Sequence, residues 1–301
     1  MEFIQNYTGE LAALLVAVFW TITALAFESA SLKVGSMSVN VIRLFIGLAF
    51  LTIFNLVYKG SLFPFRADGY NWLWLTLSGL IGFVFGDYFL FRSYTIIGSR
   101  FAMLIMTLVP PITAFFSWFI LRERLTLLNY AGMCLTFSGI AMAIFNRRNG
   151  KEKLSLKLAP IGLLFAFFGA LGQALGLVLS KLGMADSDPF AATQVRLVAG
   201  FTGFVIIVTL LKRWSDVRTA LSNRAGVRAI FLGSFFGPFL GVSFSLVSVK
   251  YIAAGIASTL MAIVPVLIIP PAVLLFRQKV TLWEVAGAFI SVIGVALFFI
   301  K

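Results

Sequence analysis

The stretch LRERLTLLNYAGMCLTFSG, residues 121–139, decides the organisation of this chain, because a degraded copy of it, FRQKVTLWEVAGAFISVIG, occupies residues 276–294. The two copies share six residues at matched positions: Arg122 with Arg277, Thr126 with Thr281, Leu127 with Leu282, Ala131 with Ala286, Gly132 with Gly287 and Gly139 with Gly294. The second half of the sequence therefore repeats a unit that is already present in the first.

Other parts of the two halves match at nearly the same spacing. A spacing of 155 residues also relates Val109-Pro110 to Val264-Pro265, Gly82 to Gly237 and Gly86 to Gly241. A spacing of 153 residues lays VIRLFIG over QVRLVAG and so places Arg43 on Arg196. We therefore expect two related domains, residues 1–150 and 151–301.

The composition is that of a polytopic membrane protein. Hydrophobic residues make up 60% of the 301 residues and charged residues 12%, and the mean hydropathy is +1.02. A helix needs roughly 20 apolar residues to cross about 30 Å of hydrocarbon. Ten segments meet this requirement: 10–27, 39–58, 72–91, 96–120, 127–145, 158–182, 191–211, 229–249, 252–276 and 282–300. The loops are too short for a soluble catalytic domain, so function must lie between the helices.

Five helices in each half predict an inverted repeat, because the second half must enter the membrane from the opposite side. The expected fold is an all-α membrane protein with ten transmembrane helices, arranged as two inverted five-helix repeats around a central cavity. Loops on the side opposite the termini carry fifteen basic residues, against seven on the side of the termini. The positive-inside rule then predicts that both termini lie outside.

The chemistry of the side chains argues against an enzyme. The chain has one cysteine, Cys134, and no histidine, which excludes an internal disulfide and any histidine-based metal site or catalytic base. We expect no cofactor and no metal. The net charge of +13 is typical of nucleic-acid binders in soluble proteins, but here basic loops facing anionic lipid explain it, so we expect a lipid bilayer and no nucleic acid as partner.

Three charged residues inside predicted helices are candidates for a functional role. Arg43 and Arg196 are either symmetry-related anchors for an anionic group, such as a carboxylate, or side chains that snorkel to the interface. Asp87 is the only acid deep within a span, and its match in the second half is Val242. Because burial favours a neutral carboxyl, Asp87 is a possible proton-coupling group; alternatively it neutralises Arg92 or Arg43.

Polar residues and prolines give further candidates. Trp20, Thr21 and Thr23 in the first helix, and Gln173 in the sixth, either line a cavity or hold neighbouring helices together. The glycines of the sixth helix are expected to serve helix packing: Gly162, Gly169, Gly172 and Gly176.

The two prolines that recur at matched positions, Pro110 and Pro265, each interrupt a helical hydrogen-bond ladder, and we interpret them as hinges. Inert transmembrane helices also contain proline. Glu28 is expected to be a hydrated helix end without a role. Glu123, flanked by Arg122 and Arg124, is expected to form a salt-bridged turn or a helix-end contact.

The repeated stretch, preceded by SYTIIGSRFAMLIMTLVPPITAF at residues 93–115, resembles the drug/metabolite transporter superfamily, specifically proteins with two EamA-type domains. The resemblance implies an inner-membrane exporter of small metabolites, such as amino acids, or of drug-like compounds. It also implies a cavity lined by the first, third, fourth, sixth, eighth and ninth helices. Gln278 replaces the usual turn acid in the second copy, and Trp20 and Thr21 stand where small multidrug resistance proteins carry a membrane-embedded acid.

The leading hypothesis is a multi-pass secondary transporter of the cytoplasmic membrane that exports amino acids or similar amphipathic solutes by alternating access. The expected substrate-binding residues are Trp20, Thr21, Arg43, Asp87, Gln173 and Arg196. Alternatives are an exchanger of sugar phosphates or nucleotide sugars, and a non-transporting scaffold or sensor. We expect a monomer, with a dimer as the alternative.

Overall fold

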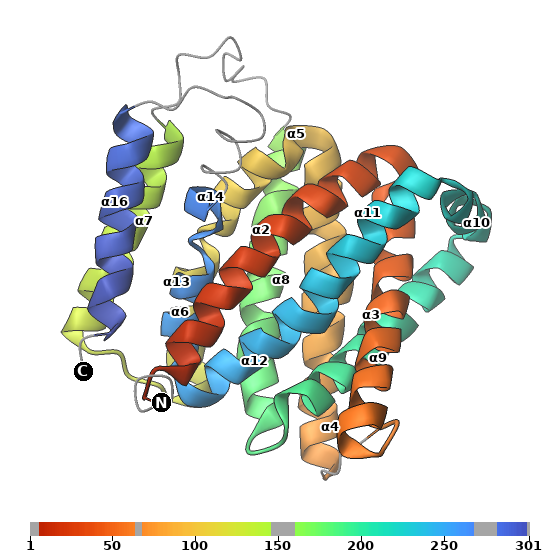
Figure 1. The fold of residues 1–301 in the computed structure, drawn as a ribbon, viewed down its shortest axis with the longest axis horizontal. Coiled ribbons are helices and arrows are strands. Elements are labelled where there is room, and N and C mark those ends of the chain that lie inside the picture. Colours follow the sequence, from red (N-terminus) through yellow and green to blue (C-terminus); the bar gives the residue numbers. More distant parts are fainter. Residues whose placement is uncertain (1–5, 64–67, 146–159, 268–281, 300–301) are drawn as a thin grey trace.

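A computed structural model describes residues 6–63, 68–145, 160–267 and 282–299. Within these ranges the chain is helical and contains no strand (Figure 1). The first repeat contains α2 (Thr8–Val34), α3 (Ser36–Lys59), α4 (Gly69–Gly79), η1 (Leu80–Asp87), α5 (Tyr88–Met106), α6 (Val109–Phe116), η2 (Ser117–Leu121) and α7 (Leu127–Phe145). The second contains α8 (Pro160–Met184), α9 (Pro189–Leu210), α10 (Trp214–Ser222), α11 (Arg224–Ser234), η3 (Phe235–Gly241), α12 (Val242–Tyr251), α13 (Ala254–Met261), α14 (Val264–Leu267), α16 (Leu282–Ala296) and η4 (Leu297–Phe299).

Within the described residues, six helices are long and apolar enough to cross a membrane: Thr8–Val34, Ser36–Lys59, Gly69–Ser99, Pro160–Met184, Pro189–Leu210 and Arg224–Tyr251. Three shorter apolar helices accompany them: Val109–Leu121, Leu127–Met142 and Val285–Phe299. The structure thus confirms an all-helical membrane architecture, but the described residues do not show ten uninterrupted spans. The sequence also missed α10, a short helix in the connection before the eighth segment.

The boundary between the third and fourth segments differs from the sequence prediction. The third helix continues past residue 91 without a loop, and the chain turns sharply at Gly98, where φ is 76° and ψ is 158°. Only glycine adopts such a conformation at little cost, because a Cβ atom would clash with the backbone. One glycine therefore replaces the loop that the sequence led us to expect.

Two π-helical segments, η1 and η3, occupy matched positions in the third and eighth membrane helices. Pro238 lies inside η3, where its missing N–H removes one α-helical hydrogen bond. A π-helical turn accommodates an extra residue and is frequent at functional sites. Both segments face the interior of the bundle through buried residues, including Asp87 and Gly237.

The helical parts of the two copies that the structure describes pack against each other. Helices α7 and α16 form a pair beside the main bundle (Figure 1). A Cβ atom at Gly139 would lie 2.4 Å from the backbone nitrogen of Ser291, and one at Gly294 would lie 2.5 Å from that of Thr136. The shared glycines are therefore explained by close helix contact in the membrane.

Glycines also bring α8 against the third membrane helix. A Cβ atom at Gly172 would lie 2.5 Å from the Cα of Gly86, and one at Gly176 would lie 2.8 Å from the Cα of Gly82. The backbones thus touch, as the packing interpretation of these glycines predicted. This contact brings Gln173 of α8 within reach of Asp87.

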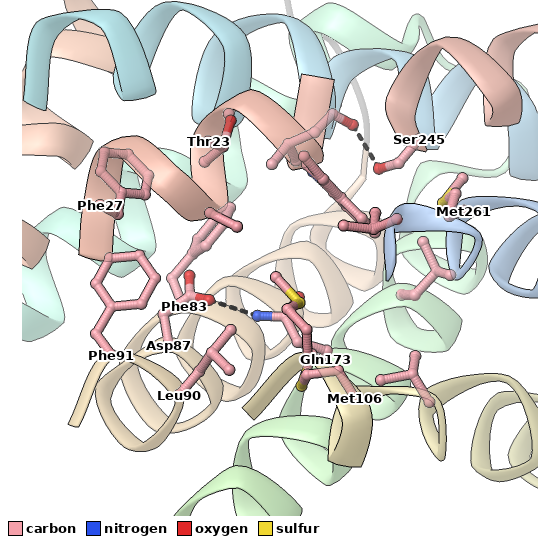
Figure 2. Close-up of a pocket in the computed structure, with 18 of the residues that line it drawn as sticks. Thr23, Phe27, Phe83, Asp87, Leu90, Phe91, Met106, Gln173, Ser245 and Met261 are labelled. Carbon is pink, nitrogen blue, oxygen red and sulfur yellow. Dashed lines mark hydrogen bonds between the residues drawn. The ribbon is translucent and has the colours of Figure 1, made fainter. Parts of the chain in front are cut away.

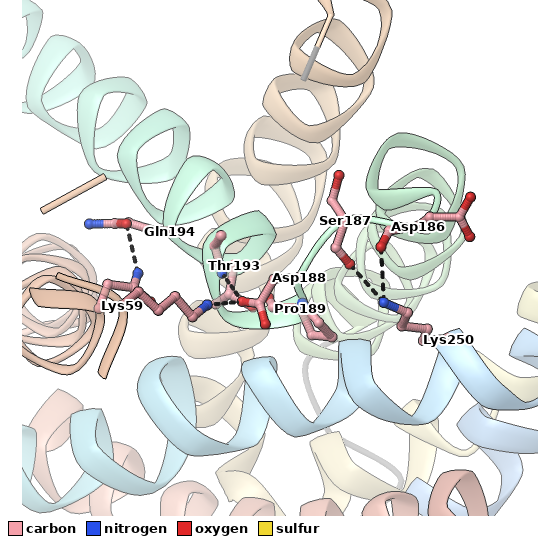
Figure 3. Close-up of polar contacts among 10 residues, drawn as sticks. Lys59, Asp186, Ser187, Asp188, Pro189, Thr193, Gln194 and Lys250 are labelled. Atoms are coloured by element: carbon pink, nitrogen blue, oxygen red, sulfur yellow. Dashed lines mark hydrogen bonds and ion pairs between the residues drawn. The ribbon is translucent and has the colours of Figure 1, made fainter. Parts of the chain in front are cut away.

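The turn between α8 and α9 is held by lysines from two other helices (Figure 3). Lys59, at the end of α3, forms an ion pair with Asp188. Lys250 of α12 donates hydrogen bonds to the carbonyl oxygens of Asp186, at 3.0 Å, and Ser187, at 3.1 Å. We call this end of the bundle the α8–α9 end, and the opposite end, at the turn between α2 and α3, the α2–α3 end.

Candidate functional site

A cavity of about 130 Å³ lies inside the bundle. Residues from the first, third, fourth, sixth, eighth and ninth membrane segments line it, as the family resemblance implied, and the second and seventh add Arg43 and Arg196. Pockets for small molecules usually measure about 300–1,000 Å³. The cavity is therefore smaller than usual for a small-molecule site.

Asp87 is the polar centre of the cavity. Arg43 forms an ion pair with its Oδ2 atom, and the Nε2 atom of Gln173 donates to its Oδ1 atom at 2.6 Å (Figure 2). The same Nε2 atom lies 3.3 Å from the carbonyl oxygen of Gly82. Asp87 therefore meets three helices at one point: its own, α3 and α8. A buried carboxylate with charged and polar donors on both oxygens is tolerated inside a membrane.

Arg43 is fully accommodated within the protein. Its Nε atom donates to the side-chain oxygen of Asn40 at 2.9 Å, and its guanidinium carbon lies 4.7 Å from the ring centroid of Phe91 and 5.5 Å from that of Phe27. Aromatic faces attract a cation in this geometry. Arg43 is only 4% exposed, so it does not snorkel to the interface. Of the two partners considered for Asp87, the structure selects Arg43, and Arg92 is exposed.

Arg196 is equally buried but forms no ion pair of its own with a described residue; it interacts electrostatically with Asp87, whose carboxylate is bonded to Arg43 and Gln173. It is 5% exposed, and its guanidinium carbon lies 5.0 Å from the centroid of Phe83. No described residue forms an ion pair with it, and its buried Nε atom has no hydrogen-bond partner among them. The position in the second repeat that matches Asp87 is Val242, which also lines the cavity but cannot neutralise a cation.

The remaining walls are mainly apolar. Aromatic and methionine side chains dominate them: Phe27, Phe83, Phe91, Met103, Met106 and Met261. The hydroxyl groups of Thr23, Ser245 and Ser258 all donate to carbonyl oxygens of their own helices. The cavity therefore combines an apolar surface with one cation that has no ion pair of its own among the described residues.

Most of the predicted site residues meet here. Trp20, Arg43, Asp87, Gln173 and Arg196 all line the cavity. Thr21 does not: it is buried and donates to the carbonyl oxygen of Ala17 at 2.8 Å.

Thr23 lines the cavity instead of Thr21. Thr23 follows Trp20 by three residues, so the two side chains lie on the same face of the helix. The sequence analysis also missed the methionines of the fourth segment, Met103 and Met106, and it missed the π-helical segments. The described residues contain no cluster of three acidic or cysteine side chains that could hold a metal.

The predicted hinges lie next to breaks in the helices. The fourth segment is interrupted at Thr107 and Leu108, directly before α6, whose first turn contains Pro110. The ninth is interrupted at Ala262 and Ile263, directly before the short helix that contains Pro265. The geometry agrees with a hinge at each proline, and motion itself stays a prediction.

Comparison with known proteins adds independent information. The model of the EamA-like transporter family matches this chain twice, over residues 7–145 and 160–300. A curated relative, the uncharacterized transporter YyaM of Bacillus subtilis, is 27% identical over 226 residues, which cover 72% of this chain and 70% of YyaM. The uncharacterized membrane protein YMR253C of Saccharomyces cerevisiae is 40% identical over 73 residues, but these cover only 24% of this chain and 17% of YMR253C.

A solved crystal structure shares the fold, with a TM-score of 0.70 and 19% identity, covering 97% of this chain and 95% of that one. Two matches to the family model account for nearly all of the sequence. The chain therefore belongs to the EamA-like transporter family, and it is a multi-pass membrane transporter rather than an enzyme.

Proposed function

We propose that this protein is a secondary transporter that exports a small amphipathic solute with one carboxylate, such as an amino acid, across the cytoplasmic membrane. The observation that carries the substrate class is Arg196, a buried guanidinium without an ion pair of its own among the described residues, in a cavity whose walls are mainly apolar. A carboxylate can accept two parallel hydrogen bonds from one guanidinium, which makes arginine well suited to bind it.

The charge of the cavity limits what the substrate can be. Arg43 and Asp87 neutralise each other, so Arg196 supplies one net positive charge. A monoanion balances that charge, whereas a zwitterion is neutral overall and only its carboxylate pairs with the guanidinium. The aromatic and methionine walls offer apolar surface to the rest of the solute. A phosphate ester carries more negative charge than one guanidinium compensates. The cavity thus favours a carboxylate over a sugar phosphate or a nucleotide sugar.

Alternating access agrees with the size of the cavity and with the breaks in its walls. At about 130 Å³ the site is smaller than the usual range for small-molecule pockets, about 300–1,000 Å³, so we expect its walls to move when a larger solute binds. Two repeats of opposite orientation, each contributing one broken helix and one π-helical segment, provide matched walls that can move in turn. The direction of transport and the cytoplasmic membrane follow from the family resemblance.

Counterflow in proteoliposomes tests this function. Purified protein is reconstituted with an internal unlabelled solute, and uptake of the labelled solute is followed with and without an imposed pH gradient. The panel pairs each amino acid with its amide, for example phenylalanine with phenylalaninamide, because the pair differs in the carboxylate and in little else. Saturable counterflow of the acid but not of the amide is expected. Equal counterflow of both would contradict the role of the carboxylate, and no flux across the panel would contradict amino-acid transport.

A further inference from the structure

Two eight-residue helices form matched walls of the cavity. The first wall segment, residues 99–106, lies between the turn at Gly98 and the end of α5. The second wall segment is α13, Ala254–Met261, which lies 155 residues further along the sequence. Each contributes side chains to the cavity at the same two positions: Met103 and Met106 from the first, and Ser258 and Met261 from the second.

The inner end of each wall segment is a break in the helix. The first stops before Thr107 and Leu108, and the second before Ala262 and Ile263. A Val-Pro pair follows each break, and proline cannot donate the backbone hydrogen bond that would bind one helical piece to the next. Each wall segment can therefore tilt about its inner end without unwinding.

A carboxylate holds the outer end of each wall segment, at the matched backbone position. Glu28 of α2 accepts hydrogen bonds from the backbone N–H of Ser99 at 3.1 Å and from its hydroxyl group at 2.6 Å. Glu123, in the turn between the fourth and fifth segments, accepts one from the backbone N–H of Ala254 at 2.9 Å. Ser99 and Ala254 are 155 residues apart and begin the two wall segments. Glu28 is therefore not the inert helix end that the sequence suggested.

These two carboxylates stabilise the N-terminal ends of the wall segments. The first N–H groups of a helix have no partner within the helix, and the helix dipole places partial positive charge there. A carboxylate at this position accepts the hydrogen bond and interacts favourably with the dipole, and both Glu28 and Glu123 are partly buried. Releasing the carboxylate therefore frees the outer end of the wall segment.

The two caps are built differently at the two ends of the bundle. At the α2–α3 end, Glu28 reaches the wall segment directly from α2. At the α8–α9 end, the residue 153 positions after Glu28 is Lys181, which forms an ion pair with Glu123 at 2.5 Å and donates to the carbonyl oxygen of Ile252 at 2.7 Å. Glu28 on α2 is thus matched by Lys181 on α8. Lys181 does not cap the wall segment itself but holds Glu123 in the position where Glu123 caps it.

We propose that the two wall segments are the gates of the transporter, that Glu28 latches the first and that Glu123, held by Lys181, latches the second. The inference rests on the proposed alternating access and identifies the contacts that control it. Release of the Glu28 latch opens the cavity towards the α2–α3 end, and release of the Glu123 latch opens it towards the α8–α9 end. Both latches are closed in this structure, in agreement with the small cavity.

Accessibility of the cavity from each side of the membrane tests the gates without any substrate. The reporter is a single cysteine, Thr23→Cys, on the cavity wall in a Cys134→Ser background, labelled with a membrane-impermeant maleimide from one side at a time. A separate protein with the single cysteine Lys33→Cys identifies which side is the α2–α3 end, because Lys33 is exposed there.

Glu28→Gln is expected to raise labelling from the α2–α3 end about tenfold and to lower it from the other end. The variant loses a charge-assisted hydrogen bond that exists only in the state with this gate closed, so the population shifts towards the open state. Glu123→Gln is expected to do the reverse, and Lys181→Met should follow Glu123→Gln. Asp216→Asn is the matched control, because it removes a carboxylate that pairs with Arg213 and does not cap a wall segment. It should leave labelling unchanged.

Any other pattern would overturn the proposal, including a shift in only one of the two variants or equal changes from both sides. If Glu28→Gln does not fold, Ser99→Ala is used in its place, because it removes one hydrogen bond of the same cap. If Glu123→Gln does not fold, Lys181→Met is used in its place, because it removes the ion pair that holds Glu123. Normal counterflow by the wild type together with unchanged sidedness in the variants would refute the gates and leave the transport function standing. If the variants shift labelling between the two sides as expected but the wild type shows no counterflow, the gates stand and the proposed transport function is refuted.

Discussion

Replacing Arg196 with glutamine separates the binding of an anionic group from the stability of the fold. The arginine is buried, and no described residue accepts a hydrogen bond from its Nε atom or pairs with its charge. Its removal therefore breaks no ion pair between described residues and takes away the net positive charge of the cavity. Asp87 loses its attraction to Arg196 but keeps its ion pair with Arg43. We expect the Arg196→Gln protein to be at least as stable in detergent as the wild type.

The magnitude of the transport defect follows from the lost interaction. A hydrogen bond to a charged group contributes about 1.5–3 kcal/mol, and each 1.4 kcal/mol corresponds to about a tenfold change in affinity. We therefore expect half-saturation for a carboxylate substrate to rise by roughly one to two orders of magnitude. Arg196→Lys keeps the charge but loses the paired donors. Its half-saturation concentration should therefore lie between those of the wild type and Arg196→Gln.

Counterflow measured over a range of substrate concentrations checks this, with the amide analogue as internal comparison. Arg92→Gln is the matched control, because it removes an arginine from the exposed surface and should change nothing. The reasoning is refuted if Arg196→Gln transports the carboxylate like the wild type, or if it loses acid and amide substrates to the same extent.

Four further predictions follow from the same geometry. Arg43→Gln, although it replaces the matched arginine of the first repeat, leaves Asp87 buried without its counter-ion; it should destabilise the protein by about 3–5 kcal/mol, and a thermal melt no lower than that of Arg196→Gln would contradict this. Asp87→Asn should abolish the effect of a pH gradient on counterflow if Asp87 couples protons, whereas flux that still follows the gradient would remove it from coupling. Gly139→Ala should weaken the packing of α7 on α16 by about 1–3 kcal/mol, because the new Cβ would lie 2.4 Å from the backbone nitrogen of Ser291; a melting temperature equal to that of the wild type would refute the tight contact. A single cysteine introduced as Asn149→Cys should resist an impermeant thiol reagent applied to intact cells if the termini lie outside, and labelling there would reverse the orientation.

The sequence by itself determined the membrane class, the repeat and the transporter family. These properties depend on features that are local or periodic along the chain: apolar length, the matched glycines and prolines, and the recurrence of residues 121–139. The same features predicted where the helices would break, because Pro110 and Pro265 remove backbone donors wherever they stand. They also predicted that the glycines of α8 would pack against a neighbour.

Only the tertiary structure decided which charges are paired. Arg43 and Arg196 occupy equivalent positions in the sequence, yet Arg43 forms an ion pair with Asp87 across 44 residues of chain. Arg196 forms no ion pair with a described acid and interacts with Asp87 only at longer range. Likewise, Glu28 and Glu123 show their capping roles only when they reach Ser99 and Ala254, which lie 71 and 131 residues away. Whether a buried charge stabilises or destabilises the protein depends on the atoms within a few ångströms of it. The packing of helices that are distant in the sequence, rather than the local sequence, brings those atoms together.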